Sequence, residues 1–203
     1  MFIGPLFVKL LINKNDINLC GVYYIIMELI QSIEDASSSY SSQPNTLIDK
    51  WVLWAHLPHN TDWSLKSYIK LQQLETVEDV VSITNAIPEK MVKNCMLFLM
   101  RKNINPVWED PHNCNGGCFS FKVLNKNVLQ VWKELSYSIT GETLSDKTDF
   151  MGNINGITIS PKKSFCIIKL WTKTLDFQNP RDIISISGLQ VNGCLFKKHK
   201  SNY

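Results

Sequence analysis

Apolar residues recur along residues 51–198 with two different periods, which separate the expected strands from the expected helices. Strands are expected where β-branched and aromatic residues alternate with polar ones or form short runs. The segments with that pattern are 51–57, 67–74, 95–101, 118–123, 155–160, 165–171 and 193–198. Strands therefore outnumber helices, and the loops between neighbouring strands suit antiparallel pairing. The pattern predicts an α+β domain with one curved sheet and helices packed on one face.

Two segments carry the helical period instead. After Thr76, an expected N-cap with Asp79 three residues on, apolar positions continue at helical spacing until Pro88. The clearest helix follows Asn127 and ends at Gly141, a C-cap position. Its apolar stripe comprises Val128, Val131, Trp132, Leu135 and Ile139. A further short turn or helix is expected near 180–187.

The N-terminal 45 residues differ from the rest of the chain. Their apolar runs are too short to span a bilayer, and the first is interrupted by Lys9. A poorly formed signal peptide and a translation start at Met27 are both compatible with this segment. A serine-rich linker over 37–42 follows. We therefore expect 1–45 to be a poorly ordered extension and 46–203 to be the folded domain.

Composition narrows the possible functions. The chain has 203 residues, of which 44% are hydrophobic, and this suits one globular domain. Its net charge of only +3 excludes a strongly basic surface that would bind nucleic-acid phosphates non-specifically. Four of the six cysteines lie in apolar or strand-like segments, which is typical of buried, reduced thiols in a cytoplasmic protein. Cys114 and Cys118, with His112 upstream, do not have the spacing of a zinc knuckle, and no second pair lies nearby. No metal and no cofactor is expected.

The positions of the tryptophans suggest a binding site. Trp51 and Trp54 lie in a predicted strand and Trp132 on a helical stripe, so these three are expected in the core. Trp63 and Trp108 instead lie in the polar segments HNTDWSLK and NPVWEDPHN, where burial in a core is least expected. A tryptophan in a polar loop is a candidate for ligand binding.

Two such tryptophans can clamp a flat ring, and stacking contributes roughly 1–3 kcal/mol per base. A cationic ring adds about 2 kcal/mol of cation–π attraction when it is desolvated. A carboxylate in the plane of the ring accepts two parallel N–H donors, which is what the edge of guanine offers. The ligand that combines a flat ring, a positive charge and two parallel N–H donors is 7-methylguanine.

Residues 46–175 resemble the eukaryotic translation initiation factor 4E family, which binds the 5′ cap of messenger RNA. The motifs are WVLWAH, TDW, ETVEDVV, INPVWEDPHNCNGG, VWKELSYSITGE and KLWTKT, in the order and near the spacing of the family. The resemblance implies a curved antiparallel sheet of about eight strands. It also implies about three helices on the convex face and a cap pocket on the concave face. The implied function is non-catalytic cap binding in cytoplasmic translation initiation.

The resemblance also assigns roles to residues. Trp63 and Trp108 match the stacking tryptophans, and Glu109 matches the carboxylate that reads the guanine edge. The backbone N–H of Trp108 would bind the guanine oxygen, and Trp171 would contact the methyl group. Asp110 is expected to point away from Glu109, as neighbours along a strand do, and to support the loop.

The phosphate-binding positions depart from the family pattern. Two positions where the family has an arginine and a lysine hold Cys118 and Ile167 here. Lys162 aligns with a second arginine. We expect Lys162, and Lys198 and Lys200 of the terminal KKHK, to supply the remaining positive charge for the phosphates.

The implied partner surface departs as well. Family scaffolds (initiation factor 4G-like) and 4E-binding proteins carry a Tyr-x-x-x-x-Leu-apolar motif, which packs on the convex face. Val77 and Trp132 are kept there. Val81 replaces a tryptophan and Lys133 replaces an apolar residue. A partner groove with altered specificity is expected, and no membrane contact.

Three alternatives remain open on the sequence. One is a cap-binding repressor that does not engage the usual scaffold. Another is a protein-interaction domain with a decayed pocket, although the joint presence of Trp63, Trp108, Glu109 and Trp171 argues against decay. The third is an enzyme with Glu109 and Asp110 as an acid–base pair, but no nucleophile or base completes such a site in the sequence.

Overall fold

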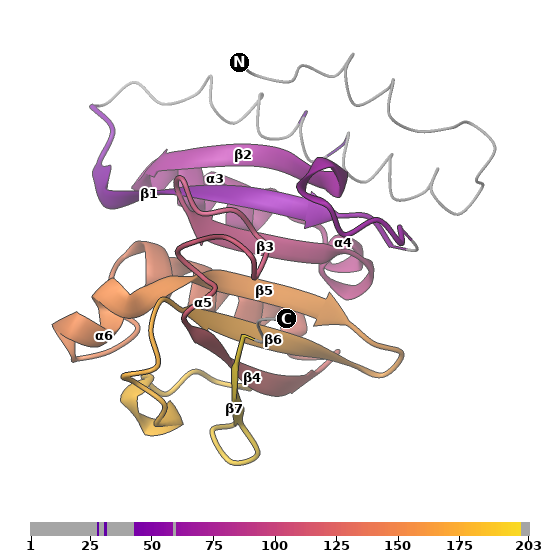
Figure 1. The fold of residues 1–203 in the computed structure, drawn as a ribbon. Coiled ribbons are helices and arrows are strands. Elements are labelled where there is room, and N and C mark those ends of the chain that lie inside the picture. The colour runs from indigo at the N-terminus through magenta and orange to yellow at the C-terminus, as the bar shows by residue number, and fades with distance from the viewer. Residues whose placement is uncertain (1–27, 29–30, 32–42, 59, 200–203) are drawn as a thin grey trace.

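Seven strands form a single antiparallel sheet in the computed structural model, which describes residues 28, 31, 43–58 and 60–199 (Figure 1). The order across the sheet is β2-β1-β3-β5-β6-β4-β7, and every neighbouring pair is antiparallel. The strands are β1 Thr46–His56, β2 Tyr68–Thr76, β3 Met96–Arg101, β4 Gly117–Leu124, β5 Ile154–Pro161, β6 Phe165–Thr172 and β7 Leu195–Lys198. The predicted α+β class is confirmed. The described residues hold seven of the roughly eight strands that the family resemblance implies.

Helices cover one face of this sheet. They are α3 Val77–Ala86, α4 Glu89–Asn94, α5 Val128–Thr140 and α6 Thr148–Asn153, with short 3-10 turns η1 Leu65–Ser67 and η2 Pro180–Asp182. In Figure 1, α3, α4 and α5 lie behind the strands, and α5 packs across β1, β4 and β5. No helix within the described ranges is long and apolar enough to cross a membrane. The predicted extension 1–45 lies almost entirely outside the described residues.

Two helices were missed from the sequence. Helices α4 and α6 have six residues each, which is too short for a helical period to show. The helix start at Thr76 is confirmed: its side chain accepts from Asp79 N, and the Asp79 carboxylate accepts from Thr76 N. The short turn or helix predicted near 180–187 is confirmed as the 3-10 turn Pro180–Asp182.

Alternation along the strands separates two apolar layers. In β1, Trp51, Leu53 and Ala55 point toward the helices and are almost fully buried. Trp54 points to the opposite face, which we call the open face, and packs partly buried against a second cluster. That cluster is Phe98, Met100, Ile104 and Trp171. The expected burial of Trp51 is confirmed, whereas Trp54 is only partly buried and packs against a separate apolar cluster, because this strand carries apolar side chains on both faces.

Arg101, the last residue of β3, lies directly before the loop 102–116 and is held by several side chains. Its guanidinium pairs with both Glu142 carboxylate oxygens at 2.7 and 2.9 Å, and also with Asp49. It lies 4.7 Å over the Trp51 ring. Glu142 adopts a φ of 55°, so the left-handed turn after α5 falls one residue beyond the Gly141 C-cap. Such conformations are costly for a non-glycine residue, and the bidentate ion pair offsets that cost.

Candidate functional site

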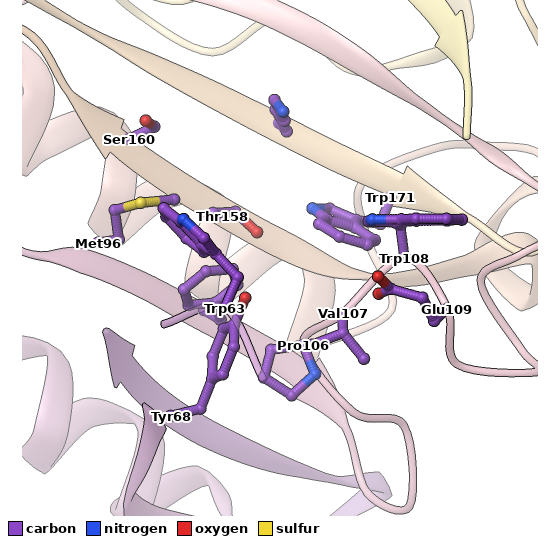
Figure 2. A pocket seen from close by; sticks show the side chains of 12 residues that line it. Trp63, Tyr68, Met96, Pro106, Val107, Trp108, Glu109, Thr158, Ser160 and Trp171 are labelled. Atoms are coloured by element: carbon purple, nitrogen blue, oxygen red, sulfur yellow. The ribbon is translucent and has the colours of Figure 1, made fainter. Parts of the chain in front are cut away.

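A cavity of about 260 Å³ opens on the open face of the sheet, between two loops and strands β3, β5 and β6 (Figure 2). It is smaller than the roughly 300–1,000 Å³ of pockets that bury drug-sized ligands, so it suits a single flat ring system. The residues that line it are Trp63, Tyr68, Met96, Phe98, Pro106, Val107, Trp108, Glu109, Thr158, Ser160, Lys169 and Trp171. All four predicted base-contacting residues are among them, although they come from three distant parts of the chain.

Trp63 stands at one side of this cavity, in the loop between β1 and η1. Its ring stacks on His56, with 4.2 Å between centroids and 1° between planes. His56 is buried at the end of β1, and its Nε2 lies 2.9 Å from the carbonyl oxygen of Asp62. The Asp62 carboxylate in turn accepts from the Ser64 backbone N–H at 2.8 Å. Trp63 therefore has one face supported by His56 and remains 55% exposed.

Trp108 and Trp171 lie on the other side of the cavity, as Figure 2 shows. Trp171, near the end of β6, is only 6% exposed and belongs to the second apolar cluster, against which Trp108 packs partly buried. The Trp171 Nε1 and the Thr158 Oγ1 are buried without a hydrogen-bond partner in the described structure. An unpaired buried polar atom costs about 1–3 kcal/mol.

The loop that carries Trp108, residues 102–116, is held by buried polar side chains. The Asp110 carboxylate accepts from the backbone N–H groups of Asn105 and His112 at 2.9 Å each, and lies 2.9 Å from His112 Nδ1. Asn113, fully buried, donates to the carbonyl oxygens of Asn105 and Val107. Asn155 of β5 donates to the carbonyl oxygen of His112 and to the Asn113 side chain. The loop is thus bonded within itself and to the sheet.

The close of this loop requires glycine at one position. A Cβ on Gly116 would lie 1.8 Å from the carbonyl oxygen of Thr172, so the backbones approach too closely for any side chain. This contact brings the end of the loop beside Trp171. The Gly-Gly pair is therefore part of the geometry of the cavity.

The two adjacent acids have different environments. Asp110 is 4% exposed and bonded within the loop, whereas Glu109 is exposed and lines the cavity. Burial raises the pKa of Tyr68 to about 12, and the charge of Glu109 adds to that rise, so the carboxylate acts electrostatically on the cavity wall. The expectation that Asp110 supports the loop is confirmed. The reason differs, because 108–110 form turns and not a strand.

Asp110 should make the stability of the loop depend on pH. Burial would raise the pKa of this carboxyl, but hydrogen bonds from Asn105 and His112 outweigh burial and lower the pKa below 3.8. The contribution of the Asp110 carboxylate to folding stability is therefore complete above about pH 4 and is lost as the pH falls through its lower pKa in the folded state.

We expect Asp110→Asn to reduce the free energy of unfolding by about 1–3 kcal/mol at pH 7. Urea unfolding at pH 7, 5 and 3 should show the difference from the wild type shrinking only at the lowest pH. A difference that is independent of pH would contradict this role.

Comparison with known proteins shows which family this chain belongs to. The family model for eukaryotic initiation factor 4E matches residues 46–201. The chain belongs to the eukaryotic initiation factor 4E family. Eukaryotic translation initiation factor 4E of Eremothecium gossypii is 33% identical over 136 residues, which span 64% of this chain and 63% of that relative.

Solved structures of the initiation factor 4E family share the architecture. The structure of Ascaris suum eIF4E-3 with m7G cap has a TM-score of 0.57 at 26% identity, over 66% of this chain and 76% of that one. The complex of Caenorhabditis elegans eIF4E-3 with the 4E-binding protein Mextli and cap analog has a TM-score of 0.58 at 25% identity, over 65% and 76%. The described sheet is therefore the initiation factor 4E sheet.

Neither Lys162 nor Lys198, two of the lysines expected to contact phosphates, lines this cavity. Lys162 is exposed in the turn between β5 and β6. A second cavity lies beside β7, and Lys162 does not line that one either. Lys198 lines the cavity beside β7, and Lys200 lies outside the described residues. Lys169 of β6, which was not among the predicted site residues, lines both cavities. The sequence pattern that could have indicated Lys169 is the alternation that places Ile167, Lys169 and Trp171 on one face of a strand.

The expected partner residues lie on the helix-covered face. Val77 and Val81 of α3 are 44% and 37% exposed, whereas Trp132 of α5 is 1% exposed. The Lys133 ammonium donates to the Asn85 side chain at 3.1 Å, across α3 and α5. The surface therefore presents apolar side chains with a lysine beside them.

The cysteine and histidine residues of the site loop are not gathered into a metal centre. Cys114 is half-buried, with its thiol 3.5 Å from the carbonyl oxygen of Pro111, and Cys118 is buried in β4. Within the described ranges, no group of three or more His, Cys, Asp or Glu side chains is arranged to hold a metal ion.

Proposed function

We propose that this protein binds the 7-methylguanosine 5′ cap of messenger RNA and acts in cytoplasmic translation initiation. The observation that carries the proposal is the convergence of Trp63, Trp108, Glu109 and Trp171 on one cavity sized for a single base. In this role Trp63 and Trp108 stack on the two faces of the ring, and His56 supports the outer face of Trp63. Membership of the initiation factor 4E family, and the cap named in the structure of the Ascaris relative, support it.

The chemistry of the cavity suits a cationic purine. Methylation at N7 gives guanine a positive charge, which the indole faces attract. The same charge makes the N–H groups of the guanine edge better donors to the Glu109 carboxylate. The backbone N–H of Trp108 would bind the guanine oxygen, and Trp171 would contact the methyl group. Lys162, Lys198 and Lys200 are the proposed phosphate contacts.

Retention on a 7-methyl-GTP resin tests this function. We expect the full chain to bind the resin, to be released by 7-methyl-GTP, and to be unaffected by the same concentration of GTP. Equal release by both nucleotides would indicate a general nucleotide site. No retention of a folded protein would favour the decayed pocket.

We further propose a partner on the helix-covered face, either a 4E-binding protein or an initiation factor 4G-like scaffold. The solved complex of the nematode relative with Mextli supports a partner of this kind. Val81 offers less apolar area than a tryptophan, and Lys133 adds a charge that a partner must desolvate. Weak binding to the usual scaffold is what a cap-binding repressor would show.

The double substitution Val81→Trp with Lys133→Leu should strengthen binding of a Tyr-x-x-x-x-Leu-apolar peptide. The additional buried apolar area should contribute roughly 1–2 kcal/mol, about a tenfold gain in affinity. Calorimetry with the wild type and the double variant measures this. Retention on the cap resin is the control and should not change, because these residues lie on the other face of the sheet. Tight binding of the peptide to the wild type would contradict the prediction.

A further inference from the structure

Side chains of α3 and α5 form an apolar patch on the helix-covered face, which we call the α3–α5 surface. It comprises Val77, Val81, Lys133 and Tyr137. The two valines are 44% and 37% exposed, and Tyr137 is 37% exposed. The two helices are bonded to each other here, because the Tyr137 hydroxyl lies 2.8 Å from Thr84 Oγ1. The free protein therefore already presents an ordered apolar surface with a lysine within it.

The N-terminal part of the chain joins the domain beside this surface. The carbonyl oxygen of Asn45 accepts from the Val77 N–H at 2.9 Å. The backbone N–H and the side-chain amide of Asn45 both donate to the Glu78 carboxylate, at 3.1 and 2.8 Å. Asn45 directly precedes β1, so these bonds fix the chain at the first turn of α3. Any segment upstream of Asn45 is therefore tethered within one helix length of Val81.

An apolar segment lies a short distance upstream of this tether. Residues 22–30 read VYYIIMELI. Within them Tyr24, Leu29 and Ile30 have the Tyr-x-x-x-x-Leu-apolar spacing that partners of the helix-covered face are expected to carry. Short apolar segments of this kind bind surfaces between helices by placing a few anchor side chains on them. The chain therefore contains its own candidate ligand for the α3–α5 surface.

The charge of this segment also suits the surface. Residues 15–49 contain no Lys, Arg or His, and Glu28 directly precedes Leu29. Glu28 and Gln31 are among the described residues, and both are helical and exposed. On the α3–α5 surface, the Lys133 ammonium is bonded to the neutral Asn85 side chain. An acidic segment would offset the cost of desolvating this ammonium, which an apolar partner would not.

The linker between the segment and its tether has a suitable length. Thirteen residues, 32–44, separate Gln31 from Asn45, and they include the serine-rich stretch 37–42. A flexible chain of this length has an end-to-end distance of about 20 Å. Helix α3 has ten residues and is therefore about 15 Å long. The segment can reach the surface of its own molecule at an effective concentration on the order of millimolar.

We propose that residues 22–30 bind the α3–α5 surface of the same molecule and compete there with outside partners. The inference rests on the partner surface proposed above, and not on cap binding. If the segment has a dissociation constant of about 0.1 mM, it occupies the surface about nine-tenths of the time and weakens an outside partner about tenfold. A second copy of the chain would match this competition only in millimolar solution, which favours contact within one molecule.

Calorimetric titration of the full chain with a synthetic peptide of residues 18–36 tests the proposal. The peptide should bind the wild type about tenfold more weakly than a variant with Tyr24→Ala and Leu29→Ala, because that variant no longer covers its own surface. A variant with Leu19→Ala and Tyr40→Ala is the matched control. It loses the same two residue types from the same extension, outside the motif, and should behave as the wild type. Equal affinities in all three proteins, or no binding to any of them, would overturn the inference.

Two further measurements locate the contact. Val77→Asp, added to the variant with Tyr24→Ala and Leu29→Ala, should abolish peptide binding, whereas Leu124→Asp, at an exposed leucine of β4, should not. Peptide binding that survives Val77→Asp would contradict the assigned surface. Light scattering should show a monomeric wild type. A dimer that Tyr24→Ala and Leu29→Ala dissociate would mean that the segment binds a second copy, against the proposal.

Retention on the cap resin separates this inference from the proposed function. It should be the same in the wild type and in all of these variants, because none of the substituted residues lines the candidate site. Loss of retention in the wild type would overturn cap binding alone. The peptide titrations would still decide whether the segment covers the α3–α5 surface.

Discussion

Trp108→Ala should abolish retention on a cap-analogue resin while the domain remains folded. The substitution removes one face of the stack around the base, and with it both stacking and cation–π attraction. Together these contribute roughly 3–5 kcal/mol, a loss on the order of a hundredfold to a few thousandfold in affinity. Trp63→Ala should act in the same way, because Trp63 forms the opposite side of the cavity and is 55% exposed. Retention assays and far-UV circular dichroism on the same preparations measure both effects.

Trp132→Ala is the control that separates binding from stability. Trp132 is 1% exposed in the main core, far from the open face, so its removal should cost about 3–5 kcal/mol of folding stability. Below its melting temperature this variant should still bind the resin. Normal retention of a folded Trp108→Ala variant would refute the stacking role.

Glu109→Gln should weaken cap binding by roughly 2–4 kcal/mol, some 30-fold to 1,000-fold. The amide keeps the shape of the carboxylate but replaces one acceptor with a donor. That donor would face the guanine N–H groups. Because Glu109 is exposed, the variant should unfold at the wild-type temperature. Titration with 7-methyl-GTP and a thermal melt measure the two quantities.

Asp110→Asn provides the matched control at the neighbouring position. Asp110 is bonded within the loop and does not line the cavity. Its variant should therefore lose stability, and lose affinity only as far as the loop is disturbed. An unchanged affinity in Glu109→Gln, or the same pattern of losses in both variants, would show that the carboxylate reading the base has been misassigned.

The elements with long, regular patterns were predictable from the sequence. Helix α5 follows from its apolar stripe, and the start of α3 from the Thr76 capping box. The separate apolar cluster that Trp54 joins was not predictable, because local composition does not show whether a strand is covered on one face or on both. Helix α4 was missed because six residues after Pro88 complete fewer than two turns.

From the residues alone, the candidate site was predictable where a residue departs from what its local setting favours, and Trp171 was added by the family resemblance. Tryptophans in polar loops stood out, and so did Glu109 beside one of them. His56 and Lys169 did not, because each occupies an ordinary strand position. Their roles depend on pairing between distant strands: Lys169 faces the cavities through its neighbours in β4 and β5. Only the tertiary register reveals that arrangement.

The loop held by Asp110, Asn113 and Asn155 has a consequence for the thermodynamics of recognition. Its hydrogen bonds form within the protein, without a ligand, so its conformational entropy is lost on folding and not on binding. Trp108 and Glu109 come from the same ordered segment, so their relative placement is set before a base arrives. Discrimination between methylated and unmethylated guanine can then appear chiefly as a difference in enthalpy, and in the rate at which the base leaves.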